Sequence, residues 1–267
     1  MNTQEIPVVL LCGGAGTRLK EETEFKPKPL VEIGGKPILW HIMKIYSHYG
    51  FRRFILCLGY KGEKIKEYFM SYEIMNSDFT LELGSANNGQ VKFHNSHLET
   101  GWKVTFVQTG EKNMTGSRVK QVEKYLDAGT FMLTYGDGIA NIDLSRLLAF
   151  HRSHGKIATV TGVRPASRFG ELVLDGTRVR EFSEKPQVST GAINGGFFVF
   201  NKEVFRYLDL NADCILEHQP LERLARDGQL MAYAHDGFWQ CVDTYRDFQL
   251  LNNLWGAQPE LWKVWKE

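Results

Sequence analysis

Apolar runs alternate with segments of helical apolar spacing along the first half of the chain. Runs without polar alternation predict strands that are buried on both faces, and apolar residues that recur every three or four positions predict helices that cover them. The predicted strands are 6–12, 54–58, 104–108 and 130–134, and the predicted helices are 38–49, 63–72, 117–126 and 143–154. This alternation is typical of an α/β fold, in which a Rossmann-like, mostly parallel or mixed sheet is flanked by helices.

The pattern changes near residue 158, where the apolar runs become shorter and more β-like. Runs at 158–164, 172–174, 179–183 and 195–200 predict a smaller β-rich region, which would form a second sheet region within the same domain. We expect one domain over 1–267, with halves at about 1–157 and 158–244 and a C-terminal helix and tail at about 245–267.

Two segments lie outside this alternation. The polar stretch 84–101 contains the turn signal Asn87-Asn88-Gly89, and it predicts either a hairpin or a contact between subunits. The C-terminal part predicts a helix over 245–254, followed by a tail that packs onto the body through Trp255, Trp262 and Trp265.

The composition indicates a globular protein whose charge is balanced. The chain has 267 residues, of which 43% are hydrophobic, enough for one large buried core. With 32 Lys and Arg against 31 Asp and Glu, the composition argues against a nucleic-acid coat or a membrane-binding face. The first apolar run is too short for a signal peptide or a membrane span, so we expect a cytoplasmic protein.

Cysteine and histidine spacing does not predict a metal site. The cysteines at 12, 57, 214 and 241 show no Cys-x-x-Cys pattern, which favours buried reduced thiols over a disulfide or a zinc site. His151 and His154, and likewise His94 and His97, lack further ligands at the usual spacing.

A glycine-rich loop follows the first predicted strand. It reads Gly13-Gly14-Ala15-Gly16-Thr17-Arg18, without the third glycine of a dinucleotide fingerprint and without the Gly-Lys-Ser/Thr of a Walker loop. Glycine has no Cβ, so the backbone N–H groups can approach an anion closely. Arg18 and Lys28 bring cationic side chains to the same place, which suits a polyphosphate. Lys26 is either a third such cation or a solvated charge.

Two aspartates follow apolar runs. Asp137 comes after the strand 130–134, and Asp243 comes after the run 238–242. Open α/β sheets bind ligands at the carboxyl ends of their strands, and Mg²⁺ typically takes one or two carboxylates together with phosphate oxygens and water. The two residues therefore predict a magnesium site beside the polyphosphate loop, although Asp137 between two glycines is also compatible with a plain turn.

The loop, together with Lys26-Pro27-Lys28-Pro29 and Gly34-Gly35-Lys36-Pro37-Ile38-Leu39, resembles the sugar-1-phosphate nucleotidylyltransferase family. The segments 21–23 and 31–41 are most similar to its glucose-1-phosphate cytidylyltransferase branch. The similarity continues through Tyr135-Gly136-Asp137-Gly138, Glu184-Lys185-Pro186 and Asn194-Gly195-Gly196. The main departure is Cys12, where the family usually has alanine.

The resemblance implies a reaction and a set of roles. The reaction is CTP + α-D-glucose 1-phosphate → CDP-glucose + pyrophosphate, with Mg²⁺ as cofactor bound by Asp137 and Asp243 and with Arg18 and Lys28 as catalytic cations. The implied nucleotide-binding residues are Leu11, Cys12, Gly13, Gly14, Ala15, Gly16, Thr17, Lys28, Thr109, Thr115, Gly116, Arg118 and Gly136. The loop that holds Thr115 is alternatively a plain helix N-terminus capped by that threonine.

The sugar phosphate is expected on the other side of the cleft. Lys185 would hold its phosphate and Glu184 would accept hydrogen bonds from its hydroxyls, whereas Glu-Lys-Pro taken by itself is more typical of a surface turn. The implied sugar-phosphate-binding residues are Gly170, Glu184, Lys185, Asn194, Gly195 and Trp239.

Two alternatives to this function stay open. One is a thymidylyl- or uridylyltransferase that acts on the same sugar phosphate. The other is a catalytically silent regulator that binds a nucleotide-sugar, which the intact set of cations and carboxylates argues against. Relatives of the cytidylyl branch are hexamers that supply dideoxysugar synthesis for lipopolysaccharide O-antigen and other surface polysaccharides, so a homo-oligomer is expected.

Overall fold

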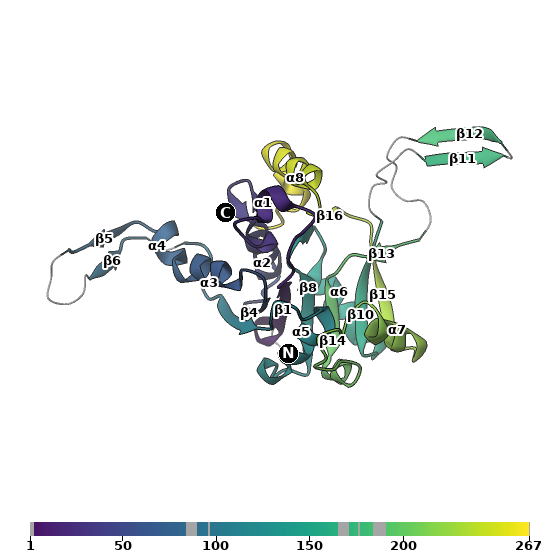
Figure 1. Cartoon of the computed structure of the whole chain (residues 1–267), viewed down its shortest axis with the longest axis horizontal. Coiled ribbons are helices and arrows are strands. Elements are labelled where there is room, and N and C mark those ends of the chain that lie inside the picture. Colours follow the sequence, from purple (N-terminus) through teal and green to yellow (C-terminus); the bar gives the residue numbers. More distant parts are fainter. Residues whose placement is uncertain are drawn as a thin grey trace.

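A computed structural model describes residues 3–83, 90–95, 97–164, 171–175, 177–183 and 191–266. Its centre is an eight-stranded mixed sheet in the order β13-β10-β14-β8-β1-β4-β7, with β15 paired to β10 (Figure 1). The strands are β1 (Pro7–Cys12), β4 (Arg53–Leu58), β7 (Lys103–Gln108), β8 (Thr130–Tyr135), β10 (Ala158–Val163), β13 (Ile193–Asn194), β14 (Phe198–Asn201) and β15 (Leu230–His235).

The four strands predicted in the first half are confirmed, and they run parallel. β1 pairs with β4 on one side and with β8 on the other, and β4 pairs in turn with β7. Alternate residues of β1 enter two separate cores, Val8 and Leu10 on one face and Val9 and Leu11 on the other. A strand covered on both faces needs apolar residues at every position, which explains its uninterrupted apolar sequence.

Helices cover both faces of the sheet. Buried side chains of four helices join the core on the face of Val8: α2 (Ile38–His48), α3 (Gly62–Met70), α6 (Leu144–His154) and α8 (Tyr245–Ala257). Those of α5 (Thr115–Gln121) and α7 (Gln219–Arg226) join the other core. Asp143 caps α6 as expected, because its carboxylate accepts a hydrogen bond from the backbone N–H of Arg146.

The second half corrects the expectation of a second sheet region. β14 pairs antiparallel with β8 and with β10, so both strands extend the same sheet. The helix α7 and the strand β15 were among the elements that the sequence did not predict. α7 has only eight residues, of which Pro220, Leu221 and Leu224 are buried. β15 is a partly exposed edge strand.

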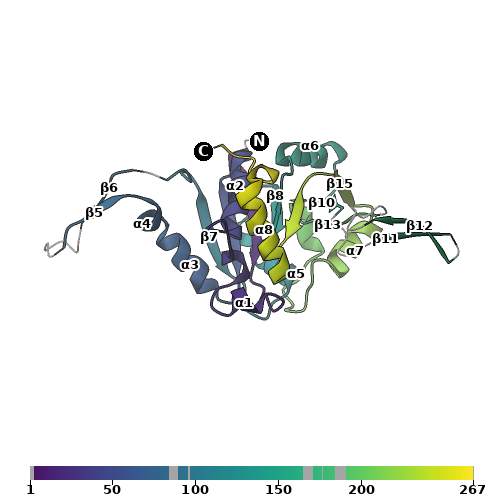
Figure 2. The same cartoon turned by 90° about the horizontal axis from the view of Figure 1, so that it is seen from above.

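The remaining elements are short. Three hairpins lie off the main sheet, β5 (Phe79–Leu81) with β6 (Val91–Phe93), β11 (Glu171–Asp175) with β12 (Arg178–Ser183), and β2 (Glu32–Ile33) with β3 (Lys36–Pro37). β9 (Gly138–Ala140) pairs with β16 (Trp239–Cys241). Of the segment 84–101, residues 91–93 form the second strand of the hairpin, whereas its first strand, β5, precedes the segment. This hairpin projects beyond α4 (Tyr72–Asn76) in both views (Figures 1 and 2). The short helices are α1 (Lys20–Thr23), η1 (Thr3–Glu5), η2 (Lys28–Leu30), η3 (Glu123–Tyr125), η4 (Lys202–Arg206) and η5 (Pro259–Leu261).

The C-terminal segment returns to the N-terminal half. α8 lies beside α2 in both views (Figures 1 and 2), and Asn252 accepts a hydrogen bond from the backbone N–H of Gly34. Trp262 is fully buried, and Trp265 packs edge-on against Trp40. The predicted packing of the tail is therefore confirmed.

The four cysteines are free thiols, and Cys12 and Cys57 are buried. Within the described parts of the chain, no helix is long and apolar enough to cross a membrane.

Candidate active site

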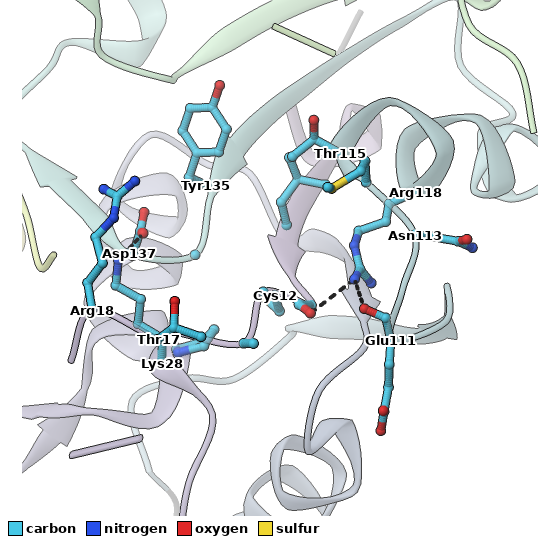
Figure 3. A pocket seen from close by; sticks show the side chains of 18 of the residues that line it. Cys12, Thr17, Arg18, Lys28, Glu111, Asn113, Thr115, Arg118, Tyr135 and Asp137 are labelled. Carbon is cyan, nitrogen blue, oxygen red and sulfur yellow. Dashed lines mark hydrogen bonds and ion pairs between the residues drawn. The ribbon is translucent and has the colours of Figure 1, made fainter. Parts of the chain in front are cut away.

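A cleft opens at the carboxyl ends of β1 and β8. Its volume is about 500 Å³, and it is lined by the loop that follows β1, the connection from β7 to α5, the end of β8 and Asp243 (Figure 3). From β1 the chain passes to β4 on one side and later returns to β8 on the other side. Because the strand order reverses at β1, the cleft lies where open α/β sheets bind their ligands.

The glycine loop rests on a buried arginine. Arg118, which is 4% exposed, donates hydrogen bonds to the backbone oxygens of Gly13 at 3.0 Å and Glu111 at 3.2 Å (Figure 3). It also donates to the hydroxyl of Thr109 at 2.8 Å. Burial lowers the pKa of Arg118. A Cβ on Gly13 would lie 2.0 Å from Nη1 of Arg118, so this position requires glycine. By contrast, a Cβ on Gly14 would meet no atom within 4 Å, so the outer side of the loop stays open to a ligand.

Most of the predicted nucleotide-binding residues come together here. The following line the cleft: Leu11, Cys12, Gly13, Gly14, Ala15, Gly16, Thr17, Lys28, Thr115, Arg118 and Gly136. Thr109 and Gly116 do not. Thr109 is buried and supports Arg118, and Gly116 packs against Cys214, whose Sγ would lie 2.6 Å from an added Cβ. These two residues therefore support the residues of the cleft and do not line it themselves.

Lys28 bridges the two predicted metal ligands. Its Nζ lies 2.6 Å from Oδ2 of Asp137 and 2.7 Å from Oδ1 of Asp243. Burial by itself would lower the pKa of Lys28, but the two carboxylates outweigh it and raise that pKa above its ordinary value. Burial opposes the ionised form of Asp243, and the hydrogen bond from Lys28 outweighs it and lowers the pKa of this carboxyl. Both carboxylates thus face one cation.

Asp243 reaches this position by a different route from the one expected. The run before it forms β16, which pairs with β9 and not with the main sheet. The backbone N–H of Val242 donates to the backbone oxygen of Asp137 at 2.9 Å, which brings the two aspartates side by side. Arg18, which is largely exposed, lies 3.4 Å from Oδ2 of Asp243. Lys26 pairs with Glu22 at 3.6 Å and does not line the cleft.

The donor set fits a divalent cation. Two carboxylate oxygens converge on the single ammonium group of Lys28, at a half-buried position beside the glycine loop. Mg²⁺ prefers one or two carboxylates and completes its octahedron with phosphate oxygens and water. Asp137 and Asp243 could therefore hold Mg²⁺ once phosphates supply the remaining oxygens.

The described part of the predicted sugar site lies next to these aspartates. Nε1 of Trp239 donates to the backbone oxygen of Gly195 at 2.8 Å, and Nδ2 of Asn194 donates to the hydroxyl of Tyr135 at 2.9 Å. Gly195 packs against β10, since an added Cβ would lie 2.5 Å from Cγ1 of Val163. Gly170, Glu184 and Lys185 lie outside the described residues.

Sequence reasoning missed several residues of the cleft. Pro29, Glu111, Lys112, Asn113, Met114 and Tyr135 line it as well. The residues 111–114 lie in the connection that follows the parallel strand β7, and that position was the signal that could have identified them. Thr115 does not cap α5, whose N-cap is Met114; its hydroxyl instead donates to Glu217 at 2.6 Å.

Comparisons with known proteins identify the family of this chain. A family model described as nucleotidyl transferase matches residues 7–254. The chain is 49% identical to a probable glucose-1-phosphate cytidylyltransferase of Bacillus subtilis, over 96% of this chain and 99% of that protein. It is also 49% identical to the glucose-1-phosphate cytidylyltransferase of Salmonella typhi, over 97% and 99% of the two chains.

Solved structures share the fold. HddC from Yersinia pseudotuberculosis superposes with a TM-score of 0.67 at 25% identity, covering 93% of this chain and 98% of that one, and it has also been solved in complex with GMP-PN. The match of the family model to nearly the whole chain, and the identity to relatives along their full length, lead to one conclusion. This chain belongs to the nucleotidyl transferase family.

Proposed function

We propose that the protein transfers a cytidylyl group from CTP to α-D-glucose 1-phosphate and releases CDP-glucose and pyrophosphate. The observation that carries this proposal is the convergence of Lys28 on Asp137 and Asp243 beside the glycine loop. The 49% identity to glucose-1-phosphate cytidylyltransferases along the chain supports the choice of both substrates.

The chemistry needs positioning and charge more than it needs a base. An oxygen of the sugar phosphate, already ionised at neutral pH, attacks the α-phosphorus while the bond to pyrophosphate breaks on the opposite side. Arg18 and Lys28 stabilise the negative charge that spreads over the phosphate oxygens in the transition state. The backbone N–H groups of the glycine loop orient the triphosphate. Mg²⁺ held by Asp137 and Asp243 would neutralise phosphate charge when it is bound.

The sugar phosphate is proposed to lie beside Asn194, Gly195 and Trp239. Two of these contact one another through the 2.8 Å hydrogen bond from Trp239 to Gly195. Gly170, Glu184 and Lys185 are proposed to complete this side, with Lys185 on the phosphate. The division into a nucleotide half at about 1–157, a sugar half at about 158–244 and a C-terminal helix and tail from 245 follows from this assignment.

The decisive experiment measures pyrophosphate release with glucose 1-phosphate and each of CTP, dTTP, UTP, ATP and GTP. We expect the highest kcat/KM with CTP, and activity that requires Mg²⁺. A preference for dTTP or UTP would instead favour the thymidylyl or uridylyl alternative. Binding of CDP-glucose without any turnover would favour the silent regulator.

We also propose a cytoplasmic homo-oligomer, hexameric as the resemblance implies. The hairpin β5–β6 supports assembly, because Phe79, Leu81, Val91 and Phe93 are each between 37% and 46% exposed. A hairpin with large apolar side chains in water favours contact with another copy of the chain. Sedimentation of the purified protein tests this, and a monomer at micromolar concentration would contradict it.

A further inference from the structure

We propose that Glu217 is a positioning residue that links the nucleotide end of the cleft to its sugar end. This inference rests on the proposed function for the identity of the two substrates. Glu217 lies on the segment that precedes α7, is partly buried, and is not part of the cleft lining. Its two carboxylate oxygens contact two residues that do line the cleft, Thr115 on α5 and Tyr135 at the end of β8.

The two contacts are short and have a defined direction. The hydroxyl of Tyr135 donates to Oε1 of Glu217 at 2.6 Å, and the hydroxyl of Thr115 donates to Oε2 at 2.6 Å. An ionised carboxylate can only accept hydrogen bonds, so both hydroxyl protons must point toward Glu217. The lone pairs of both hydroxyl oxygens then face other partners. That of Thr115 accepts from the backbone N–H of Leu216 at 2.9 Å.

The branch through Tyr135 continues into the sugar side. Because its proton is committed to Glu217, the Tyr135 oxygen accepts from Nδ2 of Asn194 at 2.9 Å. The other end of that amide, Oδ1, accepts from the backbone N–H of Gly196 at 2.9 Å. The orientation of the Asn194 amide is thereby determined, and its second N–H is available as a donor to a sugar hydroxyl. The carboxylate of Glu217 thus fixes Asn194 as a donor through the hydroxyl of Tyr135, which lies between them.

Removal of the negative charge would release this orientation. With a neutral amide at position 217, one of the two hydroxyls would meet an N–H in place of an acceptor. The Tyr135 hydroxyl could then donate to Asn194, which would turn the amide over and leave the N–H of Gly196 without its acceptor. Thr115, which begins α5 and lines the nucleotide side of the cleft, would also lose its charged acceptor and could shift. One carboxylate therefore controls both ends of the cleft.

Steady-state kinetics of four variants of the full-length enzyme test this assignment. We expect Y135F to raise KM for glucose 1-phosphate and T115V to raise KM for CTP, each roughly tenfold and each with little change in the other constant, the scale for losing a hydrogen bond to a charged group. E217Q should raise both. E222Q, an exposed glutamate of α7, is the matched control and should leave both unchanged.

A double variant separates positioning from general stability. If Glu217 acts on the sugar through Tyr135, E217Q/Y135F should show the same KM for glucose 1-phosphate as Y135F alone. Additive effects would overturn the proposal, and so would a loss of kcat or of melting temperature with both KM values unchanged. If E217Q does not fold, Y135F and T115V still test the proposal, because each is expected to raise KM for a different substrate. Equal effects of these two variants on both KM values would overturn the proposal.

The test of Glu217 does not depend on which nucleoside triphosphate the enzyme prefers. If the wild-type enzyme uses another nucleoside triphosphate, the proposed function fails in that respect, and the same variants are compared with the substrates it does use. If it has no turnover, calorimetric Kd values for CTP and for glucose 1-phosphate give the same split. If Y135F and T115V changed both Kd values equally, the role proposed for Glu217 would be overturned, whether or not the proposed reaction is correct.

Discussion

The ammonium nitrogen of Lys28 lies 2.6 Å from Oδ2 of Asp137, one of two carboxylates that face it. The ammonium group of Lys28 therefore contacts the same carboxylate oxygens that could bind a divalent cation. A cation that binds there must share or replace these contacts, because the carboxylate oxygens are the same. Lys28 also lines the cleft beside the glycine loop, where its charge can face the phosphates of the nucleotide.

Replacement of Lys28 by methionine should affect catalysis and metal binding in opposite directions. Lys28→Met retains the length of the side chain and removes its charge, and we expect kcat to fall by roughly 10²-fold or more, the scale for one transition-state contact. Without nucleotide, Mn²⁺ should bind more tightly than to the wild type, because the two carboxylates are no longer neutralised. Calorimetry and pyrophosphate release measure the two effects. Retention of more than half of the wild-type kcat would exclude a catalytic role.

The two aspartates should each affect the requirement for Mg²⁺. Asp137→Asn and Asp243→Asn each remove one anionic ligand, so the Mg²⁺ concentration for half-maximal activity should rise and kcat should fall. Asp236→Asn is the control, because Asp236 is exposed and its partner is Arg164 at 3.6 Å. A Mg²⁺ titration that overlays the wild type would identify the substituted residue as structural.

Gly13 and Gly14 are neighbours with opposite surroundings. A methyl group on Gly13 would meet the guanidinium of Arg118 at 2.0 Å, whereas one on Gly14 would meet nothing within 4 Å. Gly13→Ala must displace the buried arginine and should lower the free energy of unfolding by about 2 kcal/mol or more, together with activity. Gly14→Ala should keep the wild-type stability and change only the KM for the nucleotide. Chemical unfolding of both variants makes the comparison, and equal stabilities would contradict it.

A buried ion pair far from the cleft should make stability depend on pH. Nζ of Lys44 lies 3.1 Å from Oε1 of Glu99, and both side chains are buried beside Trp40 and Trp265. Burial opposes ionisation of Glu99, but the hydrogen bond from Lys44 outweighs it and holds its pKa below the ordinary 4.5. A depressed pKa in the folded state means that the stabilisation is complete above pH 4.5 and is lost as the pH falls through the folded value.

Glu99→Gln should therefore destabilise the protein by about 3 kcal/mol at pH 7, since it leaves the ammonium of Lys44 buried without its counter-charge. The difference from the wild type should narrow below pH 4.5. Urea unfolding at pH 7, 5 and 4 measures it, with Glu63→Gln on the exposed side of α3 as control. A difference that stayed constant over this range would show that the charge of Glu99 does not contribute.

Local sequence determined much of this protein. The uninterrupted apolar runs predicted the four parallel strands, because a strand covered by helices on both faces has no solvent-facing position. The glycine loop, Lys28, Asp137 and Asp243 were identifiable because each follows a predicted strand or lies in a recognisable motif. The chemistry of phosphate and metal binding depends on the residue types themselves, and these can be read in order along the chain.

The tertiary structure decided what depends on residues far apart in sequence. β14 joins the first sheet because it pairs with β8, and Asp243 meets Asp137 because β16 pairs with β9; no local preference specifies either partner. Arg118 was expected in the site, but only the fold places it beneath Gly13, 105 residues away. Glu217 had no local signal at all, since its contacts to Thr115 and Tyr135 span 102 and 82 residues. Periodicity reports which face of an element is buried, whereas strand pairing and buried polar contacts depend on which distant segment packs there.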